Sequence, residues 1–119
     1  VLTALEMGDL PDEGLNQLAE QCKALELKWF HLPIEDDCAP GDEFNASWPQ
    51  ANKAVQAMLD NGEVLVVHCM GGSGRTGLIA ARIMLDRGIG LDSAIEQIQA
   101  LRPGAFTRQA HIDYIKQYK

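Results

Sequence analysis

Residues 63–77 restrict the possible folds most, because a run of apolar residues leads directly into glycines: "EVLVVHCMGGSGRTG". A continuous apolar run of this length is typical of a strand that is buried on both faces of a parallel sheet. Residues 75–87 follow with apolar side chains on nearly every helical face, so we expect that helix near the centre of the molecule. The segment therefore predicts a buried strand, a loop and a central helix.

Apolar spacing and turn residues divide the rest of the chain into further strands and helices. Strands are predicted at residues 1–5, 27–32 and 63–68. Helices are predicted where apolar residues recur every three or four positions, at 15–22, 51–59, 75–87, 95–101 and 107–118. A helix separates each strand from the next, as in parallel sheets. We therefore predict an α/β fold with a parallel, or mostly parallel, central sheet flanked by helices.

Local signals set three of the expected boundaries. Residues 33–49 contain prolines, a glycine and acids, and they are predicted to form a loop. The helix that follows is expected to stop at Asn61 and Gly62. Ser93 and Glu96 have the spacing of a capping box, which predicts that a helix begins there.

The length of 119 residues, with 46% hydrophobic and 23% charged residues, suits one globular domain covering residues 1–119. Only three strands are predicted and the first begins at residue 1, so we expect that N-terminal residues of the full domain are lacking. No apolar run approaches the roughly 20 residues that span a bilayer, and residues 1–10 do not resemble a secretion signal. A cytoplasmic location is the default expectation.

The formal net charge is −7 and the basic residues are scattered, which argues against a nucleic-acid or anionic-membrane partner. Cys22, Cys38 and Cys69 are odd in number and contain no C-x-x-C pair, which argues against a disulfide framework and a zinc ribbon. We expect reduced thiols and no metal. Nothing in the sequence indicates an oligomeric state.

The glycine-rich loop has the composition of an anion cradle. Backbone N–H groups between a strand and a helix N-terminus are free to converge on an anion, and glycines remove the Cβ atoms that would interfere. Arg75 can grip two oxygens of a tetrahedral oxyanion. The same field lowers a cysteine pKa, so Cys69 is predicted to be a thiolate nucleophile, and Thr76 can donate its hydroxyl to the sulfur. The predicted cradle residues are Met70, Gly71, Gly72, Ser73, Gly74 and Arg75.

Two other interpretations of this loop fit less well. A Walker A nucleotide loop requires G-x-x-x-x-G-K-[ST], but Cys69 stands at the first glycine and Arg75 replaces the lysine. A purely structural turn with an inert buried cysteine explains neither Arg75 in an apolar helix nor the cysteine at the mouth of an anion site.

Three motifs resemble those of the cysteine-based protein tyrosine and dual-specificity phosphatases. "HCMGGSGRTG" matches H-C-x-x-G-x-x-R-[ST]-G, "HLPIEDD" is similar to the general-acid loop of the kinase-associated phosphatase subgroup, and "LRPGAF" resembles a turn of compact dual-specificity phosphatases. The resemblance implies a phosphatase-like fold, a phosphorylated protein or peptide substrate, a phosphocysteine intermediate and no cofactor. The small size implies a shallow pocket that suits phosphotyrosine, phosphoserine or phosphothreonine, whereas inositol phosphates are disfavoured because the loop lacks lysine.

Parallel strands deliver their following loops to one edge of the sheet, so the acidic loop after residue 32 should lie over Cys69. Within the motif that resembles P-x-x-D, counted from Pro33, Asp36 is the expected general acid and Asp37 the reserve. In relatives a glutamine follows the "RPGA" turn near the catalytic water. Counting places His111 at that position and Gln109 two residues earlier, and either could take the role.

Several assignments stay open at this point. His68 is either a core histidine with one hydrogen bond or a residue that holds the loop, and its side chain is expected to point away from that of Cys69. Met70 and Trp48 could form pocket wall, although a core role suits Trp48 better. Cys38 could pair with Cys69 under oxidation. The alternatives to a phosphatase are a rhodanese-like sulfurtransferase, whose loop usually has fewer residues between cysteine and cation, and a catalytically weak phosphate-binding module.

Overall fold

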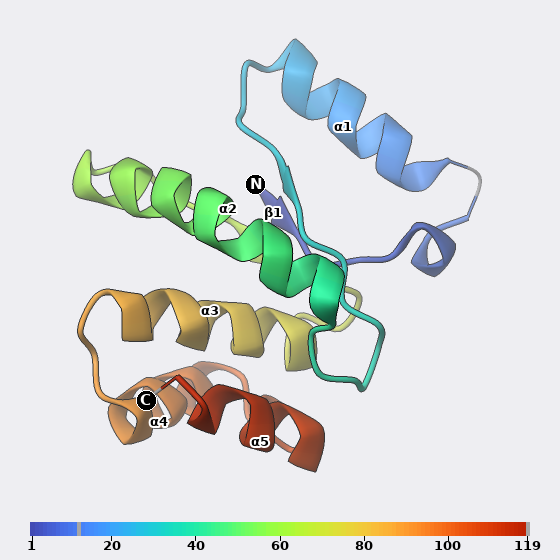
Figure 1. Cartoon of the computed structure of the whole chain (residues 1–119). Helices are drawn as coiled ribbons and strands as arrows, with labels where there is room; N and C mark the ends of the chain where they lie inside the picture. The colour runs from blue at the N-terminus through green and yellow to red at the C-terminus, as the bar shows by residue number, and fades with distance from the viewer. Residues whose placement is uncertain (12, 119) are drawn as a thin grey trace.

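A computed structural model describes residues 1–11 and 13–118 and contains a small parallel sheet. Strands β1 (Leu2–Thr3), β2 (Phe30–His31) and β3 (Val67–His68) lie in the order β2-β1-β3. Leu2 is the partner of Phe30 on one side and of Val67 on the other. The predicted α/β class and parallel pairing are confirmed (Figure 1).

The strands are shorter than predicted from residues 1–5, 27–32 and 63–68. Backbone bonds such as the one from the Ile34 amide to the Ala4 carbonyl, at 3.0 Å, continue the extended course beyond the strand ends. The prediction that 63–68 is buried on both faces was wrong, because Val64 is 85% and Val66 56% exposed. In the described part of the chain β3 has one neighbour, β1, so its other edge is uncovered.

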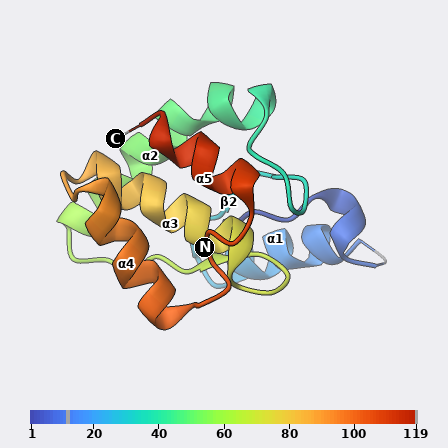
Figure 2. The same ribbon diagram turned by 90° about the horizontal axis from the view of Figure 1, so that it is seen from below.

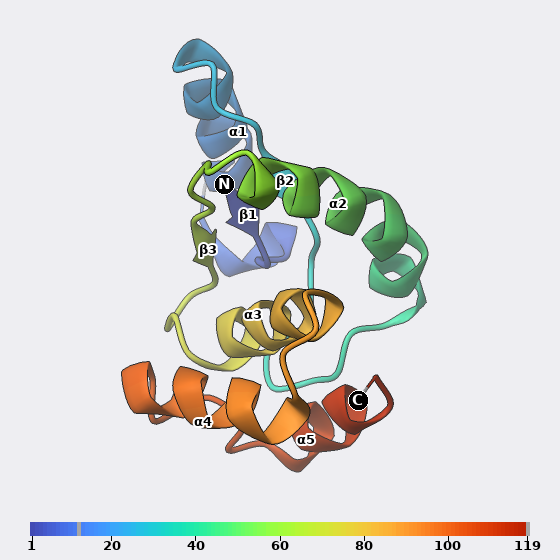
Figure 3. The same cartoon turned by 90° about the vertical axis from the view of Figure 1, so that its left-hand side faces the viewer.

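Helix α3 (Gly74–Asp86) is the central helix that the sequence predicts. It lies between the sheet and the pair formed by α4 (Leu91–Leu101) and α5 (Gln109–Lys116), as Figures 1 and 3 show. From below, α4 and α5 lie on two sides of α3 (Figure 2). Gly77 permits this packing, since a Cβ atom there would lie 2.7 Å from the Cβ atom of Ala105.

Helix α2 (Asp42–Asp60) begins well before the predicted residue 51 and includes Pro49. Two acids in its first turn, Asp42 and Glu43, are favourable at the positive end of the helix dipole. Phe44 and Trp48 are buried on one face, which contributes about 1.5–3 kcal/mol each. That burial outweighs the cost of about 3 kcal/mol for a proline within a helix, so the predicted loop at 33–49 was wrong in its second half.

The remaining helices differ from prediction mainly at their ends. Helix α1 (Gly14–Ala24) contains the predicted 15–22 segment, and a short helix, η1 (Met7–Asp9), was not predicted. The capping box at Ser93 was wrong, because α4 already begins at Leu91, and the Ser93 hydroxyl accepts a hydrogen bond from Gln97 instead. Leu91 packs against the core, which favours the earlier start. None of the helices in the described residues is long and apolar enough to cross a membrane.

Candidate active site

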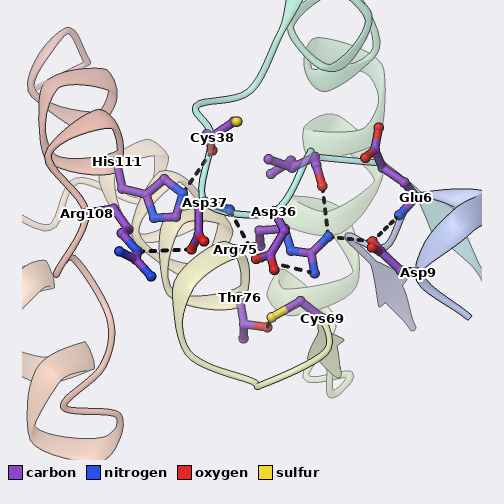
Figure 4. A network of polar contacts seen from close by, with 11 residues as sticks. Glu6, Asp9, Asp36, Asp37, Cys38, Cys69, Arg75, Thr76, Arg108 and His111 are labelled. Carbon is purple, nitrogen blue, oxygen red and sulfur yellow. Dashed lines mark hydrogen bonds and ion pairs between the residues drawn. The ribbon is translucent and has the colours of Figure 1, made fainter.

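The segments that follow the three strands meet at the carboxyl edge of the sheet. Asp9 follows β1, Asp36 follows β2 and Cys69 follows β3, and Figure 4 shows all three around Arg75. A cavity of about 260 Å³ opens here. It is lined by Asp36, Asp37, Cys69, Met70, Gly71, Gly74, Arg75, Gly104, Thr107, Arg108 and His111. The expectation that the acidic loop lies over Cys69 is confirmed.

Cys69 lies in surroundings that favour the thiolate. Burial by itself would raise the pKa of Cys69, but hydrogen bonds from the side chain and backbone of Thr76 and from the Gly72 backbone, together with the charge of Arg75, outweigh burial and lower it. The Thr76 hydroxyl donates to Sγ over 3.0 Å, as predicted. Gly72 adopts a φ of 74°, a conformation that favours glycine and turns the loop at this point.

The other two cysteines differ from Cys69. Partial burial, followed by the charge of Glu35, raises the pKa of Cys38. Cys22 is a free thiol buried on α1. Cys38 and Cys69 are also free, and in Figure 4 the Cys38 sulfur points away from Cys69. Of the three cysteines, Cys69 is the one that lines the cavity, and its pKa is lowered.

Arg75 is 2% exposed, and the protein holds one side of its guanidinium. Nη1 donates to Asp9 Oδ2 over 2.7 Å and to the Ile34 carbonyl over 2.9 Å. Nη2 lies 3.7 Å from Asp36 Oδ1, on the cavity side. Burial would lower the pKa of Arg75, but the hydrogen bond to Asp9 together with the charges of Asp9, Asp36 and Cys69 outweighs burial and raises it. The charge is thus fixed in place, and Nη2 faces the region where an anion would bind.

Asp9 is a site residue that the sequence analysis missed. Its hydrogen bond from Arg75 lowers the pKa of the carboxyl group, despite partial burial. The available signal was its position, since an acid shortly after the first strand must reach the same sheet edge as the loops after the other two. Loop length alone did not indicate that the chain would turn back toward Arg75.

The two adjacent carboxylates of the acidic loop have different partners. Asp36 is 70% exposed and faces Arg75. Asp37, whose φ is 61°, accepts a hydrogen bond from Arg108 Nε at 3.0 Å. Asp37 is therefore turned toward the segment before α5, and Asp36 is the carboxylate nearer the arginine of the cradle. Arg108 was a second residue missed from sequence, because its position is set by the packing of α5.

The structure separates Gln109 from His111. The Gln109 amide donates to Asp113 Oδ1 over 2.8 Å, and Gln109 does not line the cavity. His111 is buried, lines the cavity and contacts the Cys38 carbonyl through Nε2 at 2.9 Å. Of the two open alternatives, His111 is the one that lies at the site.

His68 and Thr3 form a polar contact beneath the loop. Trp29 donates to Thr3 Oγ1 at 2.8 Å, and His68 Nε2 lies 2.7 Å from the same oxygen. Trp29 can only donate, so Thr3 Oγ1 accepts from it, and the tautomer of the imidazole sets whether the Thr3 hydroxyl donates to His68 Nε2 or accepts from it. Burial lowers the pKa of His68. The predicted hydrogen bond of His68 is thus present, while its part in holding the loop stays a prediction.

The remaining predicted residues divide between cavity and core. Met70, Gly71 and Gly74 line the cavity, whereas Ser73 is the residue that precedes α3. Trp48 is buried in the core, as favoured, and donates to Asp86. No group of three His, Cys, Asp or Glu side chains within residues 1–11 and 13–118 is arranged to hold a metal ion.

Sequence comparison identifies the family of this site. The model of the dual specificity phosphatase catalytic domain matches residues 13–119. This chain belongs to the dual-specificity phosphatase family. A probable protein tyrosine phosphatase type IVA A of Dictyostelium discoideum is 26% identical over 84% of this chain, and protein tyrosine phosphatase type IVA 3 of Mus musculus is 28% identical over 73%. The chain spans 59% and 49% of the lengths of these two relatives.

Solved structures share the phosphatase fold. The active form of Tk-PTP superposes with a TM-score of 0.77 at 26% identity, covering 98% of this chain and 75% of that one. Kinase associated phosphatase, with its catalytic-site cysteine substituted by serine, gives a TM-score of 0.84 at 24% identity, covering 98% and 66%. The second likeness concerns the fold alone. The expected phosphatase superfamily and its fold are confirmed.

Proposed function

We propose that the protein is a phosphatase that hydrolyses phosphotyrosine, phosphoserine or phosphothreonine monoesters in protein or peptide substrates through a phosphocysteine intermediate. The observation that carries the proposal is the pairing of a cysteine of lowered pKa with a buried arginine in one cavity. The family and the phosphatase relatives favour this reaction. The sulfurtransferase alternative has no comparable support.

In the proposed first step the Cys69 thiolate attacks phosphorus and the bond to the leaving oxygen breaks. Loop amides and Arg75 hold the other phosphate oxygens and stabilise the charge that develops on them. Asp36 gives its proton to the leaving oxygen, because it is the carboxylate that faces Arg75 across the cavity. In the second step water attacks phosphorus, the phosphorus–sulfur bond breaks, and the Thr76 hydroxyl stabilises the departing thiolate.

The proposal also includes the kind of compartment in which the protein works. The three free thiols suit a reducing compartment such as the cytoplasm. The small cavity, of about 260 Å³, suits a phosphorylated side chain and leaves the choice among the three phosphoresidues to the surface around it.

The test compares turnover of an aryl phosphate with turnover of thiosulfate in the presence of cyanide. We expect aryl phosphate hydrolysis, its loss in Cys69→Ser, and continued vanadate binding by that variant, because the amides and Arg75 remain. Cys38→Ser is the matched control and should stay active, since its sulfur points away from Cys69 and Cys38 does not line the cavity. Turnover of thiosulfate alone would favour a sulfurtransferase, and vanadate binding without any turnover would favour a binding module.

A further inference from the structure

Arg108 lines the cavity and lies at its mouth. Its side chain is 59% exposed, whereas Arg75, the other arginine that lines the cavity, is 2% exposed. A phosphoresidue whose phosphate is held by Arg75 extends out of the cavity past the exposed lining residues, among them Asp36, Asp37 and Met70. The residues that flank the phosphoresidue in a substrate peptide therefore pass close to Arg108.

The protein uses only part of the Arg108 guanidinium. Nε donates to Asp37 Oδ1 over 3.0 Å, and Nη1 and Nη2 form no hydrogen bond or ion pair with residues 1–11 and 13–118. Figure 4 shows the end of the guanidinium directed away from Asp37. Its two terminal nitrogens present parallel N–H groups, which fit the two oxygens of one carboxylate. This end can therefore bind an anion while Nε stays on Asp37.

The carboxylates at the mouth leave this end of Arg108 available when a substrate binds. Asp37 is already paired with Nε, and Asp36 carries a proton in the form that acts as the proposed general acid. Among the described residues that line the cavity, Arg108 is then the exposed charged residue with unused hydrogen-bonding groups. An acidic side chain of the substrate thus meets a cation here, and a basic one meets carboxyl groups that are paired or protonated.

We propose that Arg108 determines substrate specificity by binding the carboxylate of an Asp or Glu that flanks the phosphoresidue. This inference rests on the proposed function and names the substrate class, phosphopeptides with an acidic neighbour. Nη1 and Nη2 each donate one hydrogen bond to the carboxylate. The contact is remote from the reacting atoms and is the same in the bound substrate and in the transition state, so KM should respond more than kcat.

Pairs of phosphopeptides that differ only by Glu or Gln at one flanking position test this binding. The probes are phosphotyrosine and phosphothreonine peptides of otherwise neutral sequence, with the Glu or Gln moved one position at a time on either side of the phosphoresidue. At one or more positions we expect kcat/KM of the parent to be about fivefold higher for Glu, as for a well-placed exposed ion pair. Raising the ionic strength to about 1 M should bring this ratio close to one.

Two variants of Arg108 separate the fork from its charge. Arg108→Gln removes the charge and keeps an amide that can donate to Asp37, so the preference for Glu should disappear. Arg108→Lys keeps the charge but loses the fork, so the preference should fall to about twofold.

The matched control is Arg102→Gln. Arg102 is an exposed arginine that does not line the cavity, and its substitution changes the net charge of the protein by the same amount. The control should keep the preference of the parent for Glu, because the proposed contact depends on the position of Arg108 and not on net charge.

Several results would overturn the inference. One is a preference for Glu that persists in Arg108→Gln or is lost equally in Arg102→Gln. Another is a parent that hydrolyses the Glu and Gln peptides equally at every position, a comparison that needs no variant. A decrease by the same factor for all peptides in Arg108→Gln would mean that Arg108 supports the loop or binds a main-chain carbonyl. Failure of the parent to hydrolyse any of the peptides would instead refute the proposed function.

Discussion

The Thr76 hydroxyl, which donates to Cys69 Sγ over 3.0 Å, is one of the groups that lower the pKa of Cys69. Hydrogen bonds from Thr76 are the largest contributions that lower the pKa of Cys69 against the effect of burial. Thr76→Val keeps the shape and removes the donor, so the pKa of Cys69 should rise, because one hydrogen bond to the charged sulfur is lost. The measurement is the pH dependence of Cys69 alkylation by iodoacetamide.

The midpoint of that alkylation curve should move to higher pH in Thr76→Val. Thr107→Val is the control, because its hydroxyl donates to the Gly104 carbonyl and not to the sulfur. An unchanged midpoint in Thr76→Val would show that the backbone amides and Arg75 suffice to hold the thiolate.

Asp9 should matter for stability because its partner, Arg75, is almost fully buried. Asp9→Asn replaces a charge-assisted bond by a neutral one, and the free energy of unfolding should fall by about 2 kcal/mol. Asp60→Asn is the control, since its ion pair with Arg87 is largely exposed and is worth about 0.5 kcal/mol. Urea unfolding of both variants at neutral pH measures the difference.

The same pair gives the stability a pH dependence of known sign. The pKa of Asp9 is lowered in the folded state, so the pair contributes above the unfolded carboxyl pKa of about 3.9. The contribution is lost as pH falls through the folded value, and the difference between Asp9→Asn and the parent should shrink at acid pH. Equal decreases in the free energy of unfolding for Asp9→Asn and Asp60→Asn at neutral pH would contradict this role of Asp9.

At the scale of elements, the loop between β2 and α2 carries two carboxylates whose partners separate their roles. Asp36 faces Arg75, and Asp37 is held by Arg108. A general acid contributes roughly 10²- to 10⁴-fold, and only for poor leaving groups. Asp36→Asn should therefore slow phenyl phosphate hydrolysis far more than that of nitrophenyl phosphate.

Asp37→Asn is the matched variant for this comparison. Loss of the Asp37 charge weakens the contact with Arg108 but leaves Asp36, the proposed general acid, in place. The hydrolysis rates of both substrates should therefore change alike. Steady-state rates on the two aryl phosphates measure the ratio. If the leaving-group dependence were larger in Asp37→Asn, the acid would be Asp37.

Element type could be read from sequence wherever apolar spacing was regular, but element ends could not. The prolines, glycine and acids of residues 33–49 predicted a loop, although burial of Phe44 and Trp48 extends α2 to Asp42. The run at 63–68 predicted a buried strand, yet Val64 and Val66 are exposed. Both errors come from tertiary packing, which decides how much of an apolar pattern is covered.

At the scale of the whole molecule, parallel pairing made the site predictable. It brings the segments after three strands to one edge, and the placement of the acidic loop over Cys69 followed from that rule. Contacts of Asp9 and Arg108 could not be predicted, because each joins residues far apart in sequence through loops whose course no local pattern determines. The cradle itself was predictable, since its residues are consecutive in the sequence.

The most direct test of the central claim is to identify the phosphorylated residue during turnover. We would mix the protein with an aryl phosphate, quench within the first turnover and locate the phosphoryl group by peptide mass spectrometry. We expect the phosphoryl group on the Cys69 sulfur, joined by a phosphorus–sulfur bond, absent in Cys69→Ser and present in Cys38→Ser. Release of the phenol in the first turnover without a phosphorylated cysteine, or with the phosphoryl group on another residue, would contradict the assignment of Cys69 as nucleophile.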